Sequence, residues 1–176
     1  MIILTLFLTQ TQLKVIIITS QDESEVSILN NSSRVLVCLS GKKDCCDLIE
    51  AGNALAKRDG LKLSILIALP QNACFSPDRD TLNMLYEQSK KFDAELTVFF
   101  NDAPAECAAE FARKSHAFSI VTGFPSDKSS HFVSKIHSML PDVPINMVRG
   151  NKVFHLSDAQ LSESESQMNQ LVHSKI

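Results

Sequence analysis

The amino-acid sequence predicts an α/β fold, with helices on both faces of a doubly wound, five-stranded parallel sheet. Short, almost wholly apolar runs alternate four times with segments of helical apolar spacing, and a final apolar run follows. Strands without polar alternation are typical of parallel sheets, which are buried on both faces. At 176 residues the chain is long enough for one substantial core. Right-handed crossovers then place helices on both sides of the sheet.

Each expected element is bounded by turn or capping residues. The five expected strands are Arg34–Leu39, Leu61–Leu69, Glu95–Phe100, Ser119–Thr122 and Ile145–Val148. The four expected helices are Asp44–Asp59, Asp80–Phe92, Pro104–Ser115 and Ser130–Leu140. Gly60 suits the residue that ends the first helix, and Pro104 suits the first turn of the third.

Two further segments flank this α/β domain, which we assign to residues 34–150. Residues 1–33 form an N-terminal extension with two expected short strands, Ile2–Thr5 and Val15–Thr19; a disordered leader and a membrane anchor are the alternatives. Polar residues interrupt this stretch, which disfavours a spanning helix, and it lacks the basic start of a signal peptide. Residues 151–176 are a polar, partly helical tail, in which Val153–Leu156 could add a short strand.

Composition restricts the function. A net charge of −3 argues against a nucleic-acid binder, which usually carries a basic surplus. Five cysteines without Cys-x-x-Cys spacing predict reduced thiols in a cytoplasmic protein. Cys38 should be inert inside a buried strand. Cys45 and Cys46, near a helix N-terminus and two lysines, could instead have lowered pKa values and a redox role.

No catalytic motif is evident. The sequence has no Gly-x-Ser-x-Gly, no His-Glu-x-x-His and no Walker loop, and Asp102 is an isolated carboxylate at an expected strand end. We therefore expect a binding module rather than an enzyme, with no metal. In open parallel sheets the ligand site lies beyond the carboxyl ends of the strands, where the strand order reverses.

Four segments carry a resemblance to a known family. They are Arg34–Gly41, Leu55–Leu63, Lys91–Leu96 and Ile120–Pro125. In order and spacing they resemble a universal stress protein domain (the UspA-like family), and most of all the stress-protein-like domain of Kdp-type potassium sensor kinases. The match covers roughly residues 34–148. It implies a sheet of strand order 3-2-1-4-5 and a signalling role in the stress response.

The resemblance also implies an adenine nucleotide, ATP or AMP, at the switch point. Gly123 matches the first glycine of the family's Gly-x-x-Gly, whereas Ser126 stands at the second position and Ser129-Ser130 replaces a later Gly-Ser. The resemblance thus implies a degraded site. Its expected lining is Ser40, Gly41, Ala68, Gly123, Ser129 and Ser130. For Gly41 and Gly123 a role as turn glycines is the favoured alternative, and for Ser129-Ser130 a role as a helix cap.

Partners follow from the same resemblance. We expect a homodimer through the last strand, Ile145–Val148, whose apolar edge would otherwise be exposed. A protein partner in a signalling pathway is also expected, but neither a nucleic acid nor a membrane. The alternatives are an interaction domain that binds no ligand, and an adenine-nucleotide-handling enzyme of the same superfamily.

Overall fold

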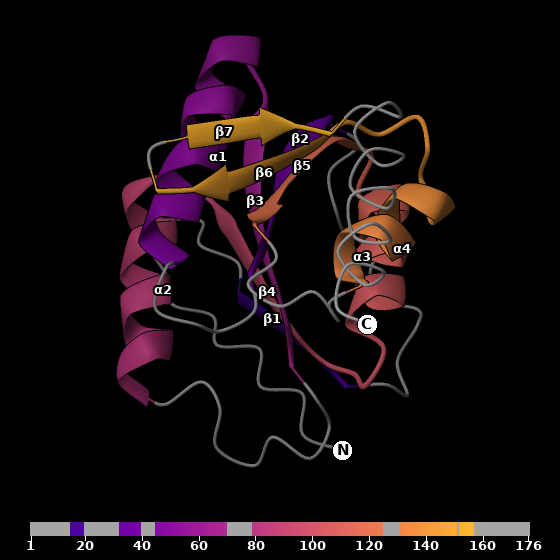
Figure 1. The fold of residues 1–176 in the computed structure, drawn as a ribbon. Helices are drawn as coiled ribbons and strands as arrows, with labels where there is room; N and C mark the ends of the chain where they lie inside the picture. The colour runs from indigo at the N-terminus through magenta and orange to yellow at the C-terminus, as the bar shows by residue number, and fades with distance from the viewer. Residues whose placement is uncertain are drawn as a thin grey trace, which may run out of the picture.

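The computed structural model describes residues 15–19, 32–39, 45–69, 79–124, 131–150 and 152–156. Strands and helices alternate along most of this length (Figure 1). In chain order they are β1 (Val15–Thr19), β2 (Arg34–Leu39), α1 (Cys45–Asp59), β3 (Lys62–Leu69), α2 (Arg79–Lys91), β4 (Glu95–Phe100), α3 (Pro104–Lys114), β5 (Ala117–Gly123), α4 (Phe132–Met139), β6 (Ile145–Arg149) and β7 (Lys152–His155).

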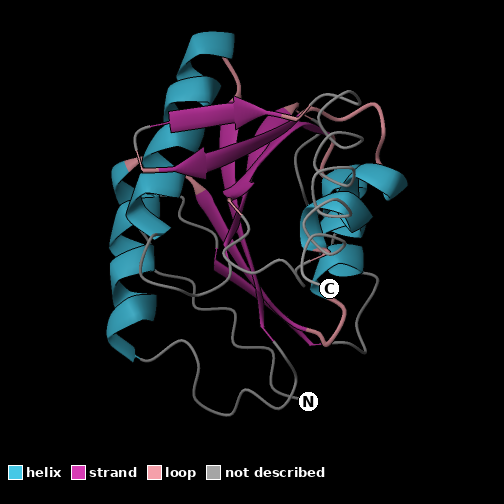
Figure 2. Cartoon of the chain, in the orientation of Figure 1, coloured by secondary structure: helices cyan, strands magenta, loops and turns pink. Residues whose placement is uncertain are grey.

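The strands form one sheet of order β1-β4-β3-β2-β5-β6-β7. All neighbouring pairs from β1 to β6 are parallel, and β7 runs antiparallel to β6. Helices α1 and α2 lie on one side of the sheet, and α3 and α4 lie on the other (Figure 2). The five strands expected from the sequence occur in the order β4-β3-β2-β5-β6, which confirms the order 3-2-1-4-5 and the α/β class.

The expected strand number is wrong, because the sheet has seven strands rather than five. At one edge β1 pairs with β4, and at the other β7 pairs with β6. The strand at Val15–Thr19 is confirmed, and the short strand expected at Val153–Leu156 occurs one residue earlier. The expected strand Ile2–Thr5 and the tail helix within residues 157–176 lie outside the described residues.

The expectation that Ile145–Val148 forms the edge of the sheet is wrong as well. Strand β6 is internal, because β7 covers the edge through which we expected the dimer. Gly150 lies between the two strands with a φ of +53°, a backbone region that glycine enters without steric cost. This turn lets the chain reverse and hydrogen-bond β7 to β6.

Two hydrophobic clusters form the core, one on each face of the sheet. Alternate residues of a strand point to opposite faces, so Val37 packs towards α1 and Leu36 towards α3 and α4. All six residues of β2 are buried, as expected for the centre of a parallel sheet. Helix α1 approaches β2 closely at Gly52, where an added Cβ would lie 2.3 Å from Val37 Cγ2.

A buried arginine connects the amino ends of three strands. Arg34, which begins β2, is 2% exposed. Its Nη1 donates hydrogen bonds to Ser64 Oγ on β3 (3.0 Å) and to Glu95 Oε2 on β4 (2.8 Å). The carboxylate compensates a charge that would otherwise be costly to bury.

Among the helices of the described residues, none is long and apolar enough to span a bilayer.

Candidate functional site

The parallel strands β2 to β6 present their carboxyl ends at one edge of the sheet. Strand β2 has β3 on one side and β5 on the other, so the strand order reverses at β2. Ligands of open α/β sheets bind outside such a switch point. The candidate site is therefore the edge where β2, β5 and β6 end.

Gly123 is the last residue of β5 and pairs with Val148 of β6. Positive φ values among the described glycines occur at Gly60 and Gly150 and not at Gly123. Its backbone therefore does not require glycine. A Cβ added there would meet one heavy atom of the described residues within 4 Å, Leu48 Cδ1 at 3.7 Å. The expected glycine thus lies at the switch point, where Leu48 is the described residue that its Cβ direction meets.

The structure does not bring Ala68 onto the same face as Gly123. Ala68 is half-buried on β3 and shares a face with Leu66, two residues earlier, which packs towards α3 and α4. The Cβ direction of Gly123 points to Leu48 on α1, which is the opposite face. The other four expected site residues, Ser40, Gly41, Ser129 and Ser130, lie outside the described residues.

The described cysteines are mostly buried in the core. Burial raises the pKa of the Cys38 thiol to about 12, and the charge of nearby Cys107 contributes to the rise. Burial alone raises the pKa of Cys107 to about 11. The reactive species is the thiolate, so Cys38 is inert at neutral pH, as expected. Cys45 is buried, and Cys46 Sγ lies 3.7 Å from Met84 Sδ on α2.

Metal-ligating side chains do not gather in the described ranges: no group there combines three or more His, Cys, Asp or Glu residues in a suitable arrangement.

A cluster that sequence reasoning missed lies next to Gly123. The Phe124 amide donates a hydrogen bond to the Val148 carbonyl (3.0 Å), which continues the β5–β6 ladder beyond Gly123. Arg149 Cζ lies 4.2 Å from the centroid of the Phe124 ring. The Phe154 ring meets Phe124 edge-on, with centroids 5.5 Å apart. A glycine between two β-prone runs, as at Gly150, was the signal for the hairpin that brings Phe154 here.

Solved structures share this fold. A universal stress protein from Archaeoglobus fulgidus in complex with dAMP matches with a TM-score of 0.51 and 14% identity, over 68% of this chain and 100% of that one. A universal stress protein in complex with cAMP matches with a TM-score of 0.51 and 16% identity, over 69% of this chain and 99% of that one. A macrolide-efflux protein from Streptococcus pneumoniae matches with a TM-score of 0.50 and 21% identity, over 78% of this chain and 58% of that one.

Comparisons of sequence find no such neighbour: no family model and no curated protein matches the chain. Identities of 14–21% establish architecture rather than activity, and one neighbour carries a transport-related name. The similarity to Kdp-type sensor kinases stays a prediction. What the comparisons do establish is that this chain has the fold of the universal stress protein structures.

Proposed function

We propose that this protein is a universal-stress-protein-like regulatory or signalling module that binds an adenine nucleotide beyond the ends of β2 and β5. The observation that carries the proposal is Gly123, which ends β5 at the switch point with Leu48 Cδ1 as its near neighbour among the described residues. A glycine here lets a phosphate approach the backbone amides, as in other anion sites built from main-chain N–H groups.

Two matching structures support the choice of ligand, because one is a complex with dAMP and the other a complex with cAMP. We also propose that the protein is cytoplasmic. Cys38, Cys46 and Cys107 are free thiols, which agrees with a reducing compartment. We propose binding without turnover; conversion of ATP to ADP or AMP by the purified protein would replace this proposal with the enzyme alternative.

Thermal unfolding tests the nucleotide site. ATP or AMP at 100 times its dissociation constant should stabilise the protein by about 2.7 kcal/mol. Gly123→Val places two methyl groups where the phosphate would approach, so the stabilisation should disappear. Ala54→Val adds two methyl groups at an exposed position of α1 and should leave the ligand response unchanged. If the shift persists in Gly123→Val, the nucleotide does not bind at this strand end.

For the homodimer, we propose pairing through the exposed edge of β7 instead of β6. The Leu156 amide donates a hydrogen bond to the Ile145 carbonyl (2.9 Å), so the backbone N–H and C=O of Leu156 point towards β6. Backbone groups alternate in direction along a strand, so those of Phe154 point towards β6 as well. The N–H groups of Val153 and His155 then point to the open edge. Val153 is 41% exposed, and an apolar edge strand of this kind favours association with a second strand.

Val153→Pro tests this pairing, because proline removes an outward N–H and leaves the hydrogen bonds to β6 intact. The wild type should have the mass of a dimer in light scattering, and Val153→Pro that of a monomer. Val153→Thr keeps the N–H and the β-branched shape, so it should remain dimeric. A monomeric wild type, or a dimeric proline variant, would exclude this interface.

A further inference from the structure

At the end of the sheet formed by β6 and β7, two aromatic rings and two cations share one face. The register pairs Met147 with Phe154 and Arg149 with Lys152, and cross-strand partners share a face. Met147 packs against the core cluster beneath α3 and α4, so Phe154 and both cations project on that side of the sheet. The Phe124 ring joins them, with Arg149 Cζ 4.2 Å from its centroid and the Phe154 ring edge-on to it. We call Phe124, Arg149, Lys152 and Phe154 the Phe154 face.

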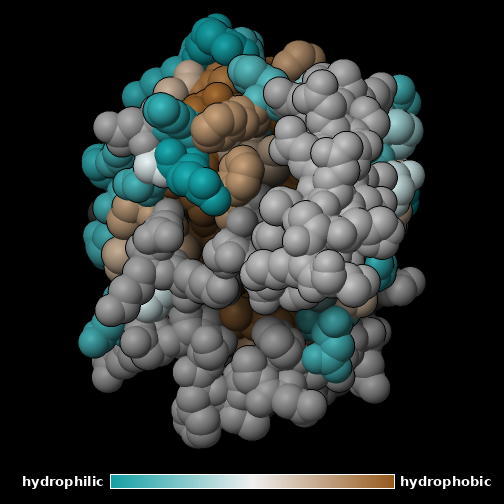
Figure 3. Space-filling model, viewed as in Figure 1, coloured by the Kyte–Doolittle hydropathy of each residue, from teal (hydrophilic) through white to brown (hydrophobic). Residues whose placement is uncertain are grey.

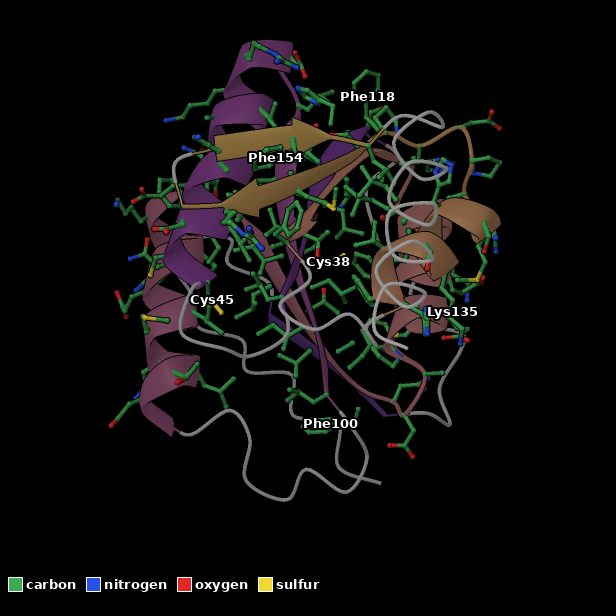
Figure 4. The ribbon with its side chains drawn as sticks, viewed as in Figure 1. Cys38, Cys45, Phe100, Phe118, Lys135 and Phe154 are labelled. Atoms are coloured by element: carbon green, nitrogen blue, oxygen red, sulfur yellow. The ribbon has the colours of Figure 1, made fainter. Side chains whose placement is uncertain are left out.

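The described helices leave this face open. Helix α3 packs over β3 and β5 and against α4 on this side, whereas α1 covers the opposite side of β6. All four residues of β7 are exposed, and Phe124 and Phe154 are 37% and 38% exposed. Figure 3 shows hydrophobic atoms at the surface around β7, and Figure 4 labels Phe154 on this strand. Exposed apolar side chains gathered in one patch mark a surface that another segment or protein covers.

The two cations of the Phe154 face lack an acidic partner in the ranges that the structure describes. There Arg113, Lys114 and Lys135 form ion pairs with glutamates, whereas Arg149 and Lys152 form none. Arg149 and Lys152 are exposed and lie directly opposite each other on β6 and β7. Like charges in this arrangement destabilise a strand pair, so a carboxylate placed between them would stabilise it. The face therefore suits an apolar segment that carries an acidic residue.

The C-terminal segment of the chain starts beside this face. Leu156, the last described residue, packs against the core cluster beneath α3 and α4, and its amide donates a hydrogen bond to the Ile145 carbonyl (2.9 Å). Its side chain therefore lies on the same side as that of Phe154, two residues earlier. Residues 157–176 follow it in the sequence. From Leu156 back to Lys152 the strand spans about 13 Å, a length that about nine residues of helix cover, so the segment is long enough to return along the face.

The sequence of this segment is typical of an amphipathic helix with an acidic residue on its apolar side. Leu161, Met168, Val172 and Ile176 recur at spacings of seven, four and four residues, which places them on one side of a helix. Glu165 lies four residues after Leu161 and three before Met168, so it belongs to the same side. A carboxylate within an apolar stripe opposes docking on a purely apolar surface and favours a surface that offers a cation.

We infer that residues 157–176 bind the Phe154 face of their own chain as a helix. The apolar side of the helix covers the two rings, and the Glu165 carboxylate accepts hydrogen bonds from Arg149 and Lys152. This contact goes beyond the proposed nucleotide site, because it lies on the α3/α4 side of the sheet, whereas the Cβ direction of Gly123 points to α1. The segment is thus a built-in cover, which any protein that binds the rings must first displace.

Hydrogen–deuterium exchange of the full chain tests this contact. In the wild type the amides of residues 161–172 should exchange about tenfold or more slowly than those of an unstructured chain, because the docked helix hydrogen-bonds them. Phe154→Ser removes an aromatic ring from the face and should reduce this protection about tenfold. Glu165→Lys places a third cation beside Arg149 and Lys152 and should reduce the protection about fivefold or more.

Charge reversal supplies a readout that a general loss of stability would not give. Lys152→Glu alone should weaken the protection, because the new carboxylate repels Glu165. The double variant Lys152→Glu/Glu165→Lys has an attractive pair again, so it should recover most of the protection that each single variant loses.

Matched controls keep the chemistry of each substitution and change its position. Glu163→Lys makes the same charge change two residues earlier, on the opposite side of the helix, and should leave the protection at the wild-type level. Leu82→Ser removes an apolar side chain of similar exposure (37%) from α2, on the other side of the sheet, and should have no effect either. Exchange at the central strand β2 should stay slow in every variant, which separates loss of docking from unfolding.

Three results would overturn the inference. The first is a wild type in which residues 161–172 exchange as fast as an unstructured chain. The second is unchanged protection in both Phe154→Ser and Glu165→Lys. The third is protection that disappears on dilution, because binding to a second copy depends on protein concentration and binding within one chain does not.

Discussion

Glu95→Ala should lower the free energy of unfolding by about 3 kcal/mol, because it removes the carboxylate that pairs with the buried guanidinium of Arg34. The Nη1–Oε2 distance is 2.8 Å, and the two side chains are 3% and 19% exposed. The partial exposure of Glu95 places the effect towards the lower end of what breaking a buried pair costs. Urea denaturation of wild type and variant measures the difference.

An exposed glutamate provides the control. Glu110 on α3 contacts Arg113 and Lys114, but half of its side chain is exposed, so solvent screens these pairs. Glu110→Ala should cost about 1 kcal/mol or less. Equal losses in Glu95→Ala and Glu110→Ala would mean that the buried pair contributes no more than a surface pair.

Gly52→Ala should also destabilise the protein, by about 2 kcal/mol. Intrinsic helix propensity alone favours alanine over glycine by about 1 kcal/mol, so an unobstructed site would be stabilised. Here the new Cβ would lie 2.3 Å from Val37 Cγ2 and 3.3 Å from Leu63 Cδ1. Val37 is fully buried at the centre of the sheet, so helix and strand must separate. Chemical denaturation of wild type and variant measures whether the free energy of unfolding falls or rises.

Removing the obstructing methyl groups should reverse this loss. Val37→Ala alone creates a cavity, but in the double variant the new alanine methyl occupies part of it. The double variant should therefore be more stable than the sum of the two single losses predicts, by about 1 kcal/mol or more. Additive losses, or a stabilised Gly52→Ala, would show that α1 does not depend on close approach at this residue.

Local patterns were sufficient for the central architecture. The third strand was expected at Glu95–Phe100 and occurs there. The signal is local, because an apolar run ends directly before Asn101, a residue typical of turns. Helices α1 and α3 each match expectation to within one residue, because a glycine or a proline marks one end. In each case the determining signal lies within a few residues of the element.

Pairing between distant segments was not predictable in the same way. The apolar run at Val15–Thr19 indicated a strand, but nothing local showed that its neighbour would be β4. Ala68 and Gly123 were expected to line one site, yet they point to opposite faces, since the register between strands decides which residues share a side. Phe124 and Phe154 meet only through the β6–β7 hairpin.

The place of β1 in the sheet affects how the chain is made. Val15 pairs with Leu96, so the first described strand to leave the ribosome waits for a partner that is synthesised much later. At about 5–20 residues per second this delay lasts several seconds or longer. Throughout it, the consecutive β-branched residues Val15–Ile18 have no β4 to pair with, which makes the nascent N-terminal segment a natural client for chaperones.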